Sequence, residues 1–442
     1  MLNCFYALGG INYKNGVITC CPRQSDQLVF SDETILPSEI YNHRNFKKIR
    51  GMLHRNQWPR GCDTCEEMEK VNAQSMRLDF LVDDKNTFRK HDLIAGERES
   101  SNKKLLDCFD KNTYEVSKEG LRHVEMRFSN ACNFACLHCS KVYSTGWERK
   151  LKNYEADEDV RRYDLRQLLG TEHRHGPNDK NQMSLSVKES LRIIEDLNEN
   201  FPEVKYLAFA GGELLYQKQF FPTLKKLTEH PNSKNIEISF HTNFNANFDI
   251  IELSDLLEPF GKSSIIISVD SGKNIYPYFR HGGEWETLES NIKNFKKHNN
   301  FTSVDTSITT SVFQLMDIYD VFESLISLGC TFDASIVQTP QYINPSILMH
   351  DFKDDILRDF KKTEQLLERY KKDVFHPVNQ KRSGKYWFDY IVDYVLKTKL
   401  PYHQFNRFLV YRKKSDEIWG QNFNDYFKNF KIVDDELIRI DS

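Results

Sequence analysis

Residues 127–141 read Arg127-Phe-Ser-Asn-Ala-Cys-Asn-Phe-Ala-Cys-Leu-His-Cys-Ser-Lys141 and place Cys132, Cys136 and Cys139 in the order Cys-x3-Cys-x2-Cys. They follow a short run of alternating apolar residues, which is typical of a β-strand. Three thiolates on one tight loop can hold three corners of a four-iron, four-sulfur cluster, since thiolates are the usual ligands of such clusters. One iron would then have no protein ligand, and this open corner is a place for chemistry.

The bulk composition excludes several classes of protein. The 442 residues are enough for more than one domain. The net charge of −3 and the pI near 6.6 give no whole-chain attraction to nucleic acid or to an anionic membrane. Because no run of about 18 apolar residues occurs, we expect no membrane span. The first residues lack the basic region and apolar core of a secretion signal, so we expect a reducing, cytoplasmic location.

A second group of cysteines lies near the start of the chain. Cys20 and Cys21 follow a predicted hairpin with an Asn-Gly turn, and Cys62 and Cys65 form a Cys-x2-Cys knuckle that leads into a predicted helix. With Cys4, they offer four soft ligands if one of the adjacent pair takes part. By composition these suit a structural zinc and a fully ligated iron–sulfur cluster equally well. The alternative is one knuckle with unrelated neighbours.

The middle of the chain alternates apolar runs with amphipathic stretches. This alternation favours a parallel sheet or partial barrel with right-handed crossovers. Six strands are predicted, at residues 123–129, 205–210, 236–241, 264–269, 304–310 and 331–337.

Two segments between these strands have recognisable local signals. Residues 186–200 are predicted to be a helix with Ser186 as its N-cap, because Glu189 stands at the capping-box spacing. Residues 148–184 are highly charged and are predicted to be an insertion or lid, whose two histidines are more typical of a solvated loop than of a metal site.

Polar residues follow the predicted strands at the points where they end. In parallel α/β sheets and barrels, ligands bind at the carboxyl ends of the strands. The sequence therefore predicts a ligand site that includes Cys132, Glu213, Asn243, Asp270 and Gln338.

At this point residues 121–340 resemble the radical S-adenosylmethionine superfamily, whose signature is the Cys-x3-Cys-x2-Cys loop after the first barrel strand. The resemblance implies that the three cysteines bind a [4Fe–4S] cluster whose open iron chelates S-adenosylmethionine. It also implies a role for Gly211, Gly212 and Glu213, which match the family's Gly-Gly-Glu motif. The carboxylate would accept the methionine ammonium, and the glycines would let the backbone approach the ligand closely.

Further matches to the same family are weaker. The resemblance places Ser268 and Asp270 near the ribose or methionyl part of the cofactor, and Asn243 beside cofactor or substrate. Arg280 would hold the methionine carboxylate, although a structural ion pair is an equal alternative. His138 is expected to pack near adenine rather than to act as an acid or base.

The N-terminal cysteines resemble a twitch/SPASM auxiliary-cluster module, which binds a second [4Fe–4S] cluster. Cys4, Gly16 and Cys21 fit the opening of that module, and Cys62 and Cys65 fit its closing knuckle; adjacent Cys20 leaves the second ligand open. The implied fold is α/β, a partial (β/α)6 TIM-like barrel with a small N-terminal auxiliary iron–sulfur domain and a helical C-terminal extension. The predicted domains are the auxiliary module at 1–80, a linker at 81–120, the barrel at 121–340 and the extension at 341–442.

The resemblance implies an enzyme that cleaves S-adenosylmethionine reductively to a 5′-deoxyadenosyl radical, which takes hydrogen from a substrate. A peptide or protein side chain is the expected substrate, with a sugar or other small metabolite as the alternative, and a reducing partner such as flavodoxin or ferredoxin is implied. The competing class is a non-catalytic iron–sulfur sensor or binding protein. Gly211-Gly212-Glu213 argues against a sensor, which needs no carboxylate for the cofactor ammonium.

Overall fold

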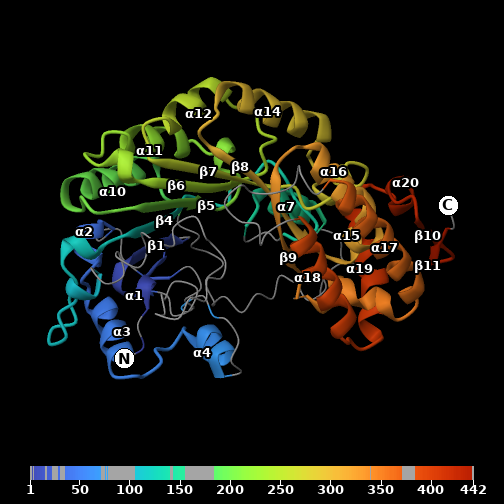
Figure 1. Ribbon diagram of the computed structural model, residues 1–442, viewed down its shortest axis with the longest axis horizontal. Coiled ribbons are helices and arrows are strands. Elements are labelled where there is room, and N and C mark those ends of the chain that lie inside the picture. The colour runs from blue at the N-terminus through green and yellow to red at the C-terminus, as the bar shows by residue number, and fades with distance from the viewer. Residues whose placement is uncertain are drawn as a thin grey trace. The chain divides into compact units, whose positions relative to one another are not determined.

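The structure of the protein is a computed structural model, which describes residues 2, 4–14, 17–21, 28–29, 35–70, 75, 77, 105–139, 143–154, 184–338, 340–370 and 384–440. The chain forms two compact units (Figure 1). The first comprises Met1–Ser129, His175–Phe240 and Ile251–Ser264, and the second comprises Asn130–Arg174, His241–Ile250 and Ile265–Ser442.

The first unit is built on strands in the order β3-β2-β1-β4-β5-β6. β1 is antiparallel to β2, as the hairpin prediction requires, but β1 is also parallel to β4. The N-terminal hairpin therefore extends the sheet at the first predicted barrel strand, which the sequence did not indicate. The bounds are β1 Gly10–Lys14, β2 Val17–Thr19, β3 Leu28–Val29, β4 His123–Arg127, β5 Tyr206–Ala210 and β6 Glu237–Thr242.

Helices cover this part of the sheet. Figure 1 shows α10 and α11 over one face of β4, β5 and β6, and the fully buried Ile193, Ile194 and Leu224 on these helices supply the apolar contact. The helices of the unit are α1 Phe5–Gly9, α2 Pro37–Ile40, α3 Arg44–His54, α4 Asp63–Lys70, α10 Val187–Asn200, α11 Phe220–Leu227 and α12 Ile250–Leu257.

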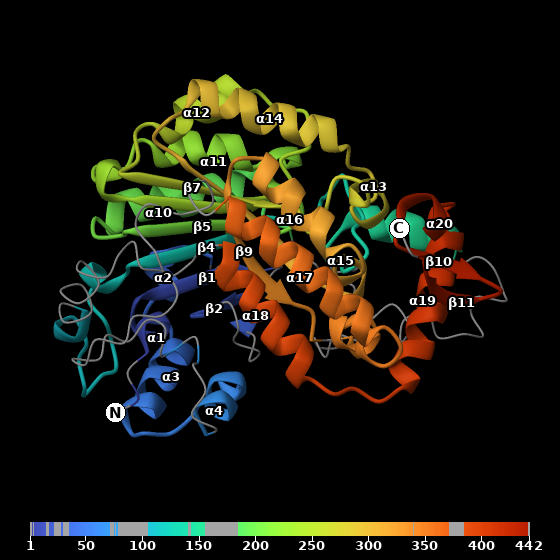
Figure 2. The ribbon, with the colours of Figure 1, turned by 45° about the vertical axis from the view of Figure 1, so that its right-hand side comes forward.

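The second unit continues the alternation with strands in the order β7-β8-β9. β8 and β9 are parallel, and along β8 every second residue is buried, as a half-covered strand requires. Figure 2 shows α18 alongside β9. The bounds are β7 Lys262–Ser268, β8 Ser303–Thr310, β9 Thr331–Ile336, α7 Thr145–Tyr154, α13 Tyr276–Phe279, α14 Trp285–His298, α15 Val312–Met316, α16 Ile318–Ser327, α17 Lys353–Arg369, α18 Gly384–Lys397, α19 His403–Trp419 and α20 Phe423–Tyr426.

The C-terminal part is mostly helical, as predicted, but it ends in a hairpin that the sequence did not reveal. Its strands are β10 Phe430–Val433 and β11 Glu436–Arg439, which pair antiparallel. Asp434 and Asp435 form the two-residue turn with positive φ at both positions, the geometry that hairpins favour. No helix among the described residues is long and apolar enough to cross a membrane.

Parallel strands that alternate with helices confirm the predicted α/β fold of partial-barrel type. Helix α10 begins after Ser186 with the predicted capping box. Of the predicted insertion at 148–184, residues 155–183 lie outside the described residues. The predicted linker is described from residue 105, where Phe109 and Val116 are buried. The predicted domain boundaries remain a prediction.

The capping box allows a stability test. Ser186 Oγ accepts a hydrogen bond from the Glu189 N–H at 3.2 Å, and Glu189 Oε2 accepts one from the Ser186 N–H at 2.7 Å. Ser186→Ala is expected to cost about 1 kcal/mol, because one orphan donor of the helix start loses its partner. Thermal unfolding followed by circular dichroism measures the effect. Lys188→Ala, at an exposed position of the same helix, is the control, and equal midpoints for the two variants would contradict the assignment.

Candidate iron–sulfur and cofactor site

The three cysteines of the central loop lie together in the second unit. Cys132 and Cys136 are buried and pack together with Phe134, and the partly buried Cys139 packs against these three side chains. None of the three forms a disulfide. A loop that gathers three unbridged thiols around one apolar residue has the donor set that an iron–sulfur cluster requires. These residues fit the group that the sequence predicts.

The backbone of the cysteine loop is fixed by the segment that follows α13. The Ala135 N–H donates to the His281 carbonyl at 3.1 Å, and the Leu137 N–H donates to the Phe279 carbonyl at 2.9 Å. These two bonds satisfy amides that the irregular loop leaves without a helix or sheet partner. Residues 135–137 therefore run side by side with residues 279–281.

Phe134, which is almost fully buried, is enclosed by two glycines. A Cβ on Gly283 would lie 2.7 Å from the Phe134 ring, and one on Gly146 would lie 2.3 Å from the Phe134 carbonyl oxygen. Any larger residue at either position would displace the loop. The close fit explains why glycine occupies both places.

Three side chains from outside the loop also hold it. Trp147 Nε1 donates to the Cys136 carbonyl at 2.8 Å, and the Tyr411 hydroxyl donates to the Leu137 carbonyl at 2.7 Å. Asn243 Nδ2 donates to Asn133 Oδ1 at 2.8 Å. The sequence predicted Asn243 as a neighbour of cofactor or substrate, and that role stays a prediction. Trp147 and Tyr411 were not predicted, because no local pattern connects them to the cysteines.

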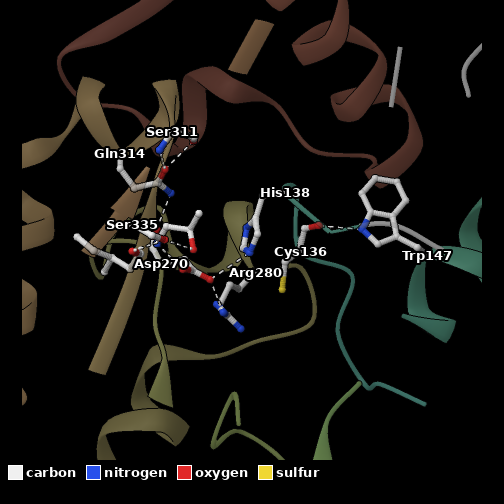
Figure 3. A network of polar contacts seen from close by, with 10 residues as sticks. Cys136, His138, Trp147, Asp270, Arg280, Ser311, Gln314 and Ser335 are labelled. Atoms are coloured by element: carbon white, nitrogen blue, oxygen red, sulfur yellow. Dashed lines mark hydrogen bonds and ion pairs between the residues drawn. The ribbon is translucent and has the colours of Figure 1, made fainter. Parts of the chain in front are cut away.

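Asp270 and Arg280 form a buried ion pair beside this loop (Figure 3). Asp270 Oδ1 also accepts the Thr309 N–H at 2.8 Å, and its backbone adopts a left-handed φ of 58°. His138 Nε2 lies 3.4 Å from Asp270 Oδ2, and the ring of His138 stacks on Phe279 with centroids 5.1 Å apart. Of the two roles open for Arg280, the structure contains the ion pair.

The charges of this group follow from its burial and its pairing. Burial raises the pKa of the Asp270 carboxyl, but the Arg280 guanidinium and His138 outweigh it and hold that pKa below its ordinary value. Burial lowers the pKa of Arg280, but the Asp270 carboxylate outweighs it and raises that pKa above its ordinary value. Burial lowers the pKa of His138 despite the nearby carboxylate. The pair is therefore ionised at neutral pH beside a neutral imidazole.

Gly211, Gly212 and Glu213 belong to the first unit. Both glycines have positive φ, 94° and 52°, and a Cβ on Gly211 would lie 3.1 Å from the Ser129 carbonyl oxygen. Glu213 is buried, and its Oε1 accepts the Leu215 N–H at 3.1 Å. The glycines thus permit the turn that places this carboxylate at the end of β5.

The remaining predicted cofactor residues are in the second unit. Ser268 is the last residue of β7 and is partly buried, and Gln338 is exposed two residues beyond β9. Asn243 is buried at the end of β6. All three lie at strand ends, as predicted.

The five N-terminal cysteines line one pocket in the first unit. Its empty volume, with its solvent-open mouth, is about 530 Å³, and Trp58 and Arg77 lie among the other lining residues. The cysteines are Cys4, Cys20, Cys21, Cys62 and Cys65.

The electrostatics of these thiols agree with a shared site. Burial raises the pKa of Cys4, and Cys65 raises it further. Burial also raises the pKa of Cys20 well above its ordinary value, with contributions from Cys21, Cys4 and Cys62. No three His, Cys, Asp or Glu side chains among the described residues are placed to hold a single metal ion.

The hydrogen bond from Tyr411 predicts a role for α19 in holding the cysteine loop. Tyr411→Phe removes a buried bond worth about 1 kcal/mol to the loop and should loosen it. After reconstitution, we expect the variant to lose iron to a chelator faster than the wild type. Tyr402→Phe, which removes an exposed bond to Asp351, is the control. Equal rates of iron loss for Tyr411→Phe and the wild type would contradict this role.

A comparison with known protein families agrees with the interpretation of the cysteine loop. Residues 126–323 match the family model described as the Radical SAM superfamily. No curated protein matches the chain significantly.

Several solved structures are similar to parts of the chain. The structure described as native anSMEcpe with bound AdoMet has a TM-score of 0.37 and 16% identity, over 56% of this chain and 60% of that one. Streptococcus suis SuiB bound to S-adenosylmethionine has a TM-score of 0.33 and 11% identity, over 69% of this chain and 57% of that one. The chain thus spans less than two thirds of either, and TM-scores below 0.5 decide neither fold nor activity.

The family match and the cysteine loop fall on the same part of the chain. The matched residues include all three thiols, Glu213, Asp270 and Arg280. Such a domain implies an enzyme that takes a [4Fe–4S] cluster and S-adenosylmethionine. Residues 126–323 are a radical SAM superfamily domain.

Proposed function

We propose that the protein cleaves S-adenosylmethionine reductively and uses the resulting radical to take a hydrogen atom from a substrate. The observation that carries this proposal is the gathering of three thiols, none of them in a disulfide, on one loop of the region that matches the family. Cys132, Cys136 and Cys139 would hold the cluster and leave one iron for the cofactor. When bound, the cluster supplies the electron that breaks the cofactor's C–S bond.

The protein's own residues would fix and shield this site. Buried Phe134 and the bonds from Trp147 and Tyr411 hold the loop, so that the thiols need little rearrangement when the cluster binds. Glu213, placed after two glycines with left-handed backbone, would accept the ammonium of the cofactor. Burial of Phe134, Trp147 and Tyr411 would limit the access of water to the loop.

The N-terminal pocket would hold a second cluster. Five thiols around one space provide the four ligands that an iron–sulfur cluster needs. Four thiols would complete such a cluster, and either Cys20 or Cys21 would not be a ligand. This cluster would take the electron back from a substrate radical or brace the substrate.

The proposed substrate class rests on the sequence resemblance. An auxiliary-cluster module favours a peptide or protein side chain over a sugar or small metabolite. One electron per turnover would come from a reducing partner such as flavodoxin or ferredoxin.

The first test removes one ligand of the central loop. Cys136→Ala should abolish formation of 5′-deoxyadenosine from S-adenosylmethionine and dithionite, because two thiols cannot hold the cluster with its open iron. Liquid chromatography with mass spectrometry measures the product. Cys108→Ala, at a partly buried thiol outside both groups, should retain it. Cleavage by reconstituted Cys136→Ala at the wild-type rate would refute the proposal.

The second test concerns the N-terminal pocket. Cys62→Ala/Cys65→Ala should lose about four irons and four sulfides per chain, the content of one cluster, while the central loop keeps its own. Elemental analysis after anaerobic reconstitution measures both, with Cys108→Ala as the control. Iron and sulfide equal to the wild type would exclude the auxiliary cluster. Zinc in the wild type, lost in the variant, would make the pocket a structural zinc site.

A further inference from the structure

Cys136 and Arg280 are the central residues of two segments that run side by side. The bonds from Ala135 to His281 and from Leu137 to Phe279 flank them on both sides. Figure 3 shows the two side chains in the same small region, next to Asp270. The geometry thus places a guanidinium opposite the middle ligand of the loop.

The guanidinium is fixed in this place. Arg280 is 5% exposed, and its Nη2 donates to Asp270 Oδ2. Asp270 is itself held by the Thr309 N–H and faces His138. Because the carboxylate has these further partners, the pair cannot swing away from the loop without breaking several contacts.

Arg280 also keeps an unused donor. Within the described residues, its buried Nε has no hydrogen-bond partner. A buried donor without a partner is costly, so such a group is a candidate for a ligand that arrives later. Cluster sulfurs accept such hydrogen bonds, and bonds of this kind and nearby charge set cluster potentials.

A buried cation favours the more negative of two redox states. Reduction adds one negative charge to the cluster, and the interaction with a guanidinium is stronger in the low dielectric of a buried site than in water. The carboxylate of Asp270, which pairs with this guanidinium, opposes the effect, because a nearby negative charge favours the less negative redox state. The two charges therefore have opposite effects on the potential.

We propose that Arg280, held in place by Asp270, is a positioning residue that raises the reduction potential of the cluster bound by the cysteine loop. This inference rests on the proposed cluster at Cys132, Cys136 and Cys139. It assigns Arg280 to the cluster rather than to the methionine carboxylate of the cofactor.

The test measures the midpoint potential of the central cluster without S-adenosylmethionine, by redox titration followed by electron paramagnetic resonance. Cys62→Ala/Cys65→Ala is the common background, so that only one cluster contributes. Arg280→Gln should shift the midpoint to lower potential, because the cation is lost. Asp270→Asn should shift it to higher potential, because the guanidinium is no longer opposed. Arg280→Lys, which keeps the charge, should lie nearer the parent than Arg280→Gln.

The double variant Asp270→Asn/Arg280→Gln serves as a second test if a single variant does not fold, since it buries no uncompensated charge. Its midpoint should lie between those of the single variants. Midpoints all equal to that of the parent, or shifts of both single variants in the same direction, would overturn the inference. Weaker binding of S-adenosylmethionine by Arg280→Gln with an unchanged midpoint would also overturn it and assign Arg280 to the cofactor carboxylate. A parent protein without iron would instead refute the proposed function.

Discussion

The site depends on one constraint: a loop that carries three thiols has no regular structure, so its backbone must be satisfied by residues from elsewhere in the chain. Two amides of the loop donate to the carbonyls of His281 and Phe279. Two carbonyls accept from Trp147 and Tyr411. Without these partners, buried polar groups would each cost free energy, and the thiols would have no fixed position.

The same contacts connect the thiols to the charges around them. The segment that bonds to the loop also carries Arg280, and Arg280 pairs with Asp270 at the end of β7. His138, from the loop itself, completes the group by facing Asp270. The segment that supports the loop backbone therefore also carries one charge of the ion pair. A change in the ion pair is expected to affect the position of the loop.

Local signals in the sequence predicted the local structure. The spacing of the three cysteines predicted that their side chains lie together, and Ser186 with Glu189 predicted the start of α10. The hairpin of β10 and β11 was missed because its turn is Asp434-Asp435, which lacks the Asn-Gly or Asp-Gly signal that identified the first hairpin.

Contacts between distant residues could not be predicted in this way. Tyr411 and Leu137 are 274 positions apart, and neither residue carries a pattern that refers to the other. The parallel pairing of β1 with β4 depends on where a strand inserts into a sheet, which one sequence does not specify. For Arg280, the sequence left two roles equal, and it could not show that the Asp270 carboxylate lies within ion-pair distance.

The central claim is that the cysteine loop holds a cluster with an iron open to S-adenosylmethionine. The most direct measurement is the electron paramagnetic resonance spectrum of the reduced, reconstituted protein with and without S-adenosylmethionine. We expect the signal of a reduced [4Fe–4S] cluster whose g values change when the cofactor is added. A cluster signal that is identical with and without S-adenosylmethionine, or no cluster signal, would contradict the claim.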